Sequence, residues 1–127
     1  MFDYKTEVKT MQQAGHSGFC APMAIAAVSG FPALEVAEYM ECEGLRRHKR
    51  AGCTIKAILD TLQGLGLKWQ EIPRGEWKTP VSIEDNPKRG AYMVFTKGHV
   101  FAVVNGRVLD WTAGRRHRVL NVIKISI

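Results

Sequence analysis

The stretch from Gly98 to Asp110, GHVFAVVNGRVLD, decides the second half of the fold, because it predicts a β-hairpin. Asn105-Gly106 is typical of a two-residue turn, and an apolar run flanks it on each side. Side chains alternate along a strand, so a turn at this place puts His99 and Asp110 on one face as diagonal neighbours. The hairpin therefore predicts an imidazole held by a carboxylate.

The register of this hairpin follows from the turn. Val104 is expected opposite Arg107, Phe101 opposite Asp110, and His99 opposite Thr112. Most other residues of the two strands are apolar. Polar groups in such a place need partners, and a catalytic pair accounts for them better than a structural pair does.

Outward from the hairpin, the chain divides into a helical half and a strand half. Helices are predicted after the turn at 15–18 as far as Gly30, from Pro32 to Glu43, and from Thr54 to Leu65, with Thr54 as N-cap. Strands are predicted over Lys68–Ile72, Ala91–Thr96, His99–Val104, Arg107–Trp111 and Val119–Ile127, with an irregular connection over Pro73–Gly90. We expect residues 1–127 to form a single α+β domain, its N-terminal helices packed on a C-terminal antiparallel sheet.

Cys20 is the candidate nucleophile. Pro22 fits only the first turn of a helix, so Cys20 should stand at the helix N-terminus, where free N–H groups and partial positive charge favour a thiolate. The same N–H groups suit the oxyanion of a tetrahedral intermediate. The alternative is a small buried residue that begins a helix.

The order of these segments resembles a known family. Gly18–Val28 is similar to the nucleophile helix of the bacteriocin-processing (C39-like) branch of the papain-like cysteine peptidases, Gly52–Leu67 to its middle helix, and Gly98–Asp110 to its His strand and following Asp. The resemblance implies a papain-like fold, a triad of Cys20, His99 and Asp110, an acyl-enzyme intermediate and cleavage of peptide or other amide bonds. It implies no cofactor.

The resemblance also implies a glutamine in the oxyanion hole. The family's glutamine falls six residues before the cysteine, at Ala14 of this chain. Gln13 is therefore our candidate for that donor, with Gln12 as the alternative. Absence of the donor would favour a second hypothesis, an inactive module that binds an acidic peptide or nucleic acid. A thiol acyltransferase or deamidase would use the same residues as a peptidase.

Composition narrows the partners and the compartment. Three cysteines and no secretory signal predict free thiols and a cytoplasmic protein, of a size that suits a viral or bacterial effector. No apolar run reaches the ~20 residues that span a membrane. The net charge of +6 favours acidic partners, so we expect an acidic polypeptide substrate and leave nucleic acid as the less favoured partner.

Two basic clusters and two further cysteines have weaker interpretations. The clusters 46–50 and 115–118 are expected to be solvated, or to contact acidic groups if they flank the cleft. Cys42 is expected to be buried in a helix. Cys42, His48 and Cys53 match no standard zinc spacing, so no metal site is predicted.

Overall fold

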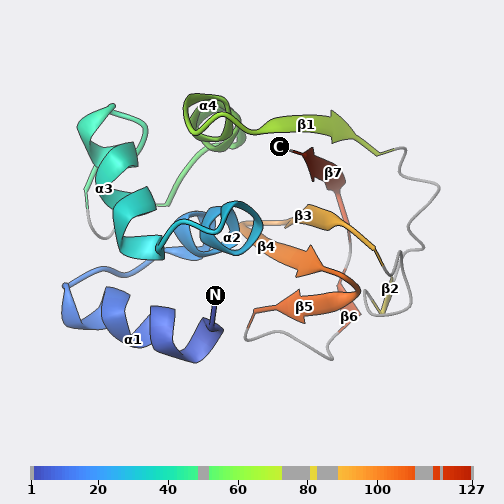
Figure 1. Ribbon diagram of the computed structural model, residues 1–127, viewed down its shortest axis with the longest axis horizontal. Helices are drawn as coiled ribbons and strands as arrows, with labels where there is room; N and C mark the ends of the chain where they lie inside the picture. Colours follow the sequence, from blue (N-terminus) through green and yellow to red (C-terminus); the bar gives the residue numbers. More distant parts are fainter. Residues whose placement is uncertain are drawn as a thin grey trace.

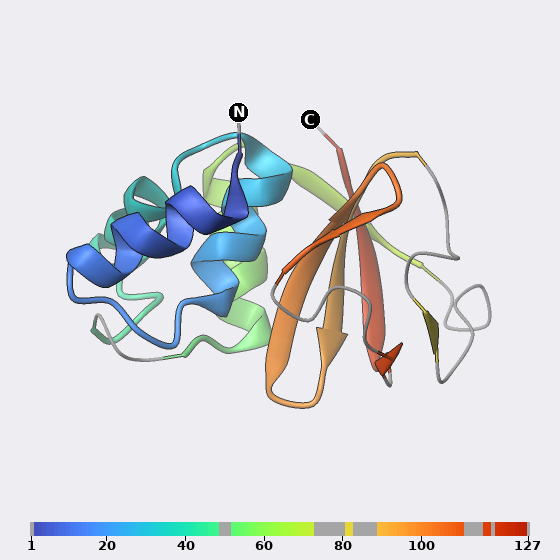
Figure 2. The same cartoon turned by 90° about the horizontal axis from the view of Figure 1, so that it is seen from below.

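The computed structural model describes residues 2–48, 52–72, 81–82, 89–110, 116–117 and 119–126. Within them, helices come first: α1 (Tyr4–Gln13), α2 (Cys20–Ser29), α3 (Ala33–Cys42) and α4 (Ile55–Gly64). The strands follow: β1 (Lys68–Glu71), β2 (Val81–Ser82), β3 (Ala91–Thr96), β4 (His99–Val104), β5 (Arg107–Leu109), β6 (Arg116–His117) and β7 (Asn121–Ser126). Figure 1 shows this order, and Figure 2 shows the helices gathered on one side of the strands. The α+β prediction is confirmed.

Three of the four helices were predicted, and their ends have the expected chemistry. The N–H of Ala57 donates to the Thr54 hydroxyl at 3.1 Å, as an N-cap requires. Gly30 ends α2 in the left-handed conformation, with φ of 85°, which glycine adopts at little cost. Phe19 occupies the N-cap position of α2 and makes no side-chain hydrogen bond there, so no residue of the turn at 15–18 caps this helix.

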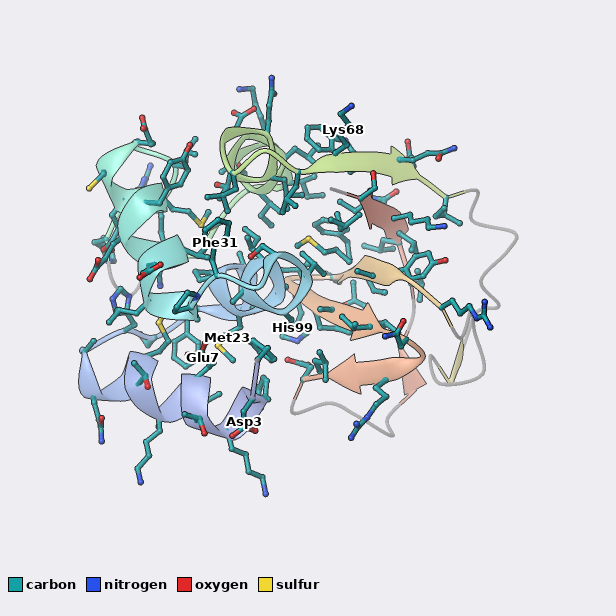
Figure 3. All side chains as sticks on the ribbon, viewed as in Figure 1. Asp3, Glu7, Met23, Phe31, Lys68 and His99 are labelled. Atoms are coloured by element: carbon teal, nitrogen blue, oxygen red, sulfur yellow. The ribbon has the colours of Figure 1, made fainter. Side chains whose placement is uncertain are left out.

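Helix α1 was not predicted. Its only apolar side chains are Tyr4, Val8 and Met11, spaced along one face, and Met11 is completely buried. The N–H of Ala33 at the start of α3 donates to a carboxylate oxygen of Glu7 at 3.4 Å, which ties α1 to α3; Figure 3 labels Glu7 on α1. This helix forms one wall of the site described below.

The main sheet has the strand order β1-β7-β3-β4-β5, and every pairing in it is antiparallel. The predicted hairpin register is confirmed where the structure describes both strands, since Val104 pairs with Arg107 and Val103 with Val108. Asn105 at the turn has φ of 51°, which asparagine tolerates. Strand β5 ends at Leu109, short of the predicted Trp111, and Asp110 is a bend residue for which the strand ladder includes no pairing with Phe101. Trp111 and Thr112 lie outside the described residues, so the expected pair of His99 with Thr112 is not tested.

A second, two-stranded sheet pairs β2 with β6, and neither strand was predicted. The first lies in the stretch expected to be an irregular connection, and the second in the basic cluster 115–118. Strand β7 begins two residues later than the predicted Val119, whose side chain is nonetheless buried. Two-residue strands leave too short a pattern to recognise in sequence.

At its central strands β3 and β4 the main sheet is buried on both faces. Val100 and Ala102 of β4 pack with the helices in one core, whereas Phe101 and Val103 belong to a second core with Val94. This is the alternation that the hairpin predicted. Helix α2 packs directly on β4, so the start of that helix lies beside the strand that carries His99.

Candidate active site

Cys20 is the first residue of α2, as predicted. The N–H groups of Cys20 and Ala21 belong to the first turn, so they have no acceptor within the helix. Pro22, the next residue, has no N–H. The Cys20 side chain is half-buried and packs against the helix–sheet core. The local sequence thus places a thiol where backbone donors and the helix dipole converge.

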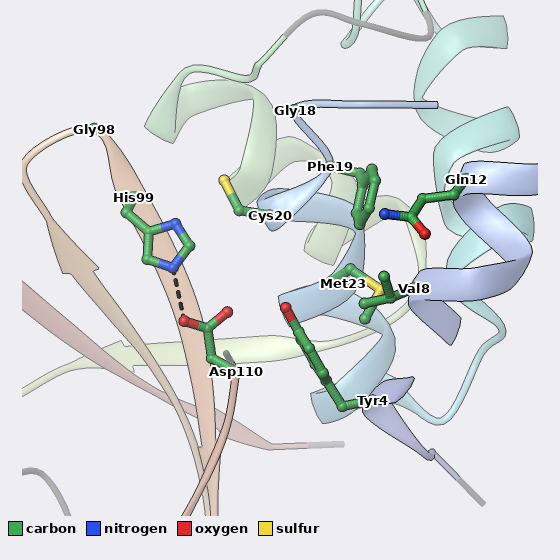
Figure 4. A pocket seen from close by; sticks show the side chains of 10 residues that line it. All are labelled: Tyr4, Val8, Gln12, Gly18, Phe19, Cys20, Met23, Gly98, His99 and Asp110. Atoms are coloured by element: carbon green, nitrogen blue, oxygen red, sulfur yellow. Dashed lines mark hydrogen bonds and ion pairs between the residues drawn. The ribbon is translucent and has the colours of Figure 1, made fainter. Parts of the chain in front are cut away.

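His99 and Asp110 form the predicted pair. Nε2 of His99 lies 2.8 Å from a carboxylate oxygen of Asp110. The Asp110 side chain is 6% exposed and the His99 side chain 21%, so the contact is screened from most of the solvent. Figure 4 shows the other ring nitrogen on the side toward Cys20. The carboxylate therefore fixes which nitrogen faces the sulfur.

The Cys20 thiol and the His99 ring hydrogen-bond each other, and this changes both pKa values. Burial alone would raise the pKa of Cys20, but the hydrogen bonds from His99 and from backbone N–H groups, with the charge of the ring, lower it. Chiefly through the hydrogen bond to Asp110, and then through that to Cys20, the pKa of His99 rises to about 10. Both shifts favour the thiolate–imidazolium form of the pair.

The backbone N–H of Val100 also hydrogen-bonds the Cys20 sulfur and lowers its pKa. Two groups of β4 thus contact the sulfur: the His99 ring and the N–H of Val100.

A cavity of about 530 Å³ opens onto this group and extends to α1. Gln12 lines it together with Tyr4 and Val8, while Gln13 is not among its lining residues; both glutamines are exposed. Of the two candidate glutamines, the structure therefore places Gln12 at the cavity and Gln13 away from it. Successive helix residues are turned by about 100°, and Gln12 shares the face of Tyr4 and Val8 by a spacing of four. Figure 4 draws the Phe19 ring between Gln12 and Cys20.

The loop before Cys20 is anchored by a buried arginine. Arg46 is 2% exposed and donates to Nδ1 of His16 and to the Ser17 carbonyl, each at 2.8 Å. The prediction that the cluster 46–50 is solvated is therefore wrong for Arg46. It is confirmed for Arg47 and His48, which are exposed, and the rest of the cluster lies outside the described residues. A guanidinium has no acceptor, so His16 accepts at Nδ1.

The remaining cysteines differ from each other. Cys42 is exposed at the end of α3, so the prediction that it is buried was wrong. Cys53 is half-buried, and burial raises its pKa, although the charge of Arg46 opposes this. Among the residues that the structure describes, no three His, Cys, Asp or Glu side chains are grouped as a metal site would require.

Comparison with known proteins adds no relative: no family model, no curated protein and no solved structure matches this chain. The fold and site define an α+β protein in which a cysteine at a helix start meets a histidine–aspartate pair on an antiparallel sheet.

In the described part of the chain, no single helix is both long and apolar enough to cross a membrane. Only the α2–α3 pair passes that test jointly, across a bend of 117°.

Proposed function

We propose that this protein is a cysteine hydrolase, a papain-like peptidase in which Cys20 is the nucleophile, His99 the general acid and base, and Asp110 the residue that orients His99. The observation that carries the proposal is the contact of Cys20 with a histidine whose other nitrogen is held 2.8 Å from a buried carboxylate. Nucleophile, base and orienting group are the three parts that covalent acyl transfer needs.

The reaction would begin from the thiolate–imidazolium pair. The Cys20 sulfur attacks the carbonyl carbon of an amide, a C–S bond forms, and the carbonyl electrons move to oxygen. The backbone N–H groups at the start of α2 would stabilise that oxyanion. The intermediate collapses when the C–N bond breaks, and the departing amine takes the proton from His99.

Hydrolysis of the resulting thioester uses the same residues. Neutral His99 removes a proton from water, the hydroxide adds to the thioester carbon, and the acid departs as the C–S bond breaks. The thiolate and the imidazolium are then restored. If an amine replaced water as acceptor, the protein would be an acyltransferase, and release of ammonia from a side-chain amide would make it a deamidase.

Alkylation at pH 6 tests the nucleophile directly. An ordinary thiol, with a pKa of about 8.5, reacts slowly there. We expect iodoacetamide to label Cys20 at least tenfold faster than Cys42 and Cys53, and His99→Ala to remove the difference. Cys42 is the internal control, because it is exposed and far from any imidazole–carboxylate pair that the structure describes. Equally slow labelling of all three cysteines would contradict the hydrolase and favour the inactive binding module.

The peptidase activity has its own test. The protein is incubated with a degenerate mixture of peptides, and new termini are sought by mass spectrometry, with Cys20→Ser as the matched inactive variant. New termini that require Cys20 support hydrolysis. Selective labelling of Cys20 without new termini, but with transfer or deamidation products, would change the class of reaction while keeping the residues.

A further inference from the structure

The reactive group lies between two cavities. On one side is the cavity of about 530 Å³ that extends to α1, with apolar walls from Val8, Phe19 and Met23. On the other is a cavity of about 440 Å³ between the start of α4 and the sheet, with apolar walls from Ile55, Ile58 and Leu120. Cys20 and His99 line both cavities, so a chain bound across the sulfur would enter each of them.

The second cavity gathers exposed apolar side chains. Large apolar residues are exposed at three places in the described part of the chain: Phe31 at 42%, Ile55 at 49% and Leu120 at 41%. Ile55 is the first residue of α4, and Leu120 directly precedes β7. Both line the same cavity. Apolar surface concentrated in a concave site beside reactive groups is typical of ligand binding.

The charges that line the two cavities are few. Lys97 is the only lysine or arginine among the lining residues that the structure describes, and Asp110 is the only carboxylate and is held against His99. Arg46, the buried arginine of the basic cluster, lines neither cavity and donates its hydrogen bonds to His16 and Ser17. The lining of the cleft therefore does not support the acidic substrate expected from the net charge.

We infer that the substrate is a polypeptide with a large apolar side chain, such as leucine or phenylalanine, on each side of the reacting carbonyl. One side chain occupies the α1 cavity and the other occupies the α4 cavity. This inference rests on the proposed function and specifies its substrate class. It also identifies Val8 and Ile55 as specificity-determining residues, one for each side of the reacting bond.

Peptidyl α-ketoamides test this, because they extend on both sides of an electrophilic carbonyl. The Cys20 sulfur adds reversibly to the keto carbon, and the oxygen takes the proton from His99, so affinity is measured without turnover. The series carries leucine, glycine or aspartate on either side. We expect leucine to bind about tenfold or more tightly than glycine at each position, and aspartate to bind no better than glycine.

Substitutions then assign the cavities. Ile55→Lys, or Leu120→Lys in its place, should abolish the leucine preference on one side, and Val8→Lys, or Val8→Ser, on the other. Phe31→Lys is the matched control: Figure 3 marks Phe31 where α2 turns into α3, its exposure resembles that of Leu120, and it lines neither cavity. It should keep both preferences.

Two failures are distinguishable. If iodoacetamide does not select Cys20 at pH 6, the proposed function fails. If it does, but glycine or aspartate binds as tightly as leucine, the apolar substrate is wrong and the hydrolase stands. Equal effects of Phe31→Lys and Ile55→Lys would likewise overturn the assignment of the cavities.

Discussion

His99 is held at 2.8 Å by Asp110, a residue that follows β5 and is 6% exposed at its side chain. The partners lie eleven positions apart and are joined by the turn at Asn105-Gly106. A buried carboxylate that hydrogen-bonds an imidazole favours the charged ring. The pKa of His99 therefore depends chiefly on this contact, and His99 in turn lowers the pKa of Cys20.

Asp110→Asn should preserve the shape of the pair and remove its charge. We expect the pKa of His99 to fall toward its ordinary value, and alkylation of Cys20 at pH 6 to slow. Any acyl-transfer activity should fall by about 10²–10⁴-fold, the range that acid–base catalysis contributes. The alkylation rate of Cys20 and the NMR titration of His99 measure both effects.

Asp60→Asn is the control for that substitution. Asp60 pairs with Lys56 at 3.1 Å on the surface of α4, with 42% of its side chain exposed. An exposed pair of this kind contributes little, so the titration of His99 should not change. A His99 titration that is the same in Asp110→Asn as in the natural protein would contradict the role of Asp110.

The stability of the protein should depend on pH through the same contact. The pKa of His99 is raised from 6.5 to about 10 in the folded state, so its contribution is fully present below pH 6.5. It is lost as pH rises from 6.5 through about 10, because the folded protein then holds a proton that the unfolded chain has released. The difference in melting temperature between the natural protein and Asp110→Asn should shrink across that range. A constant difference from pH 6 to 10 would refute the ion pair.

Arg46 should be essential for the loop that leads to Cys20. Arg46→Met leaves the His16 ring nitrogen and the Ser17 carbonyl without this donor, and a buried group without a partner costs about 1–3 kcal/mol. We expect a loss of roughly 2–4 kcal/mol of unfolding free energy in urea. Arg47→Met, at the exposed neighbouring position, should stay within about 0.5 kcal/mol. Equal losses in the two variants would show that the hydrogen bonds of Arg46 to His16 and Ser17 do not stabilise the fold.

The hairpin and the face that carries His99 and Asp110 were predictable because their determinants are local. Asn105-Gly106 fixes the turn, the turn fixes the register, and the register brings His99 and Asp110 together. The placement of Cys20 was also local, since Pro22 restricts where a helix can begin. Each of these features depends on neighbours within a few residues or on one hairpin.

What the sequence did not reveal depends on tertiary contacts or on a sparse pattern. Arg46 belongs to a run of basic residues, and only the fold shows that His16 and Ser17, about thirty residues earlier, accept its hydrogen bonds. Helix α1 was overlooked because its other side chains are polar, although Tyr4, Val8 and Met11 have helical spacing. Without that helix, the sequence could not show which of the two glutamines lies on the face toward the cavity.

The two adjacent glutamines provide the sharpest test of the oxyanion hole. Both are exposed, but Gln12 lines the cavity with Cys20 and Gln13 does not. If Gln12 donates to the oxyanion, Gln12→Ala should weaken α-ketoamide binding by about 10²-fold, the lower end of what one such donor contributes, while Gln13→Ala should bind like the natural protein. Iodoacetamide forms no oxyanion, so its reaction with Cys20 should be unchanged in both variants. Normal binding by Gln12→Ala would leave the backbone N–H groups at the start of α2 as the oxyanion donors.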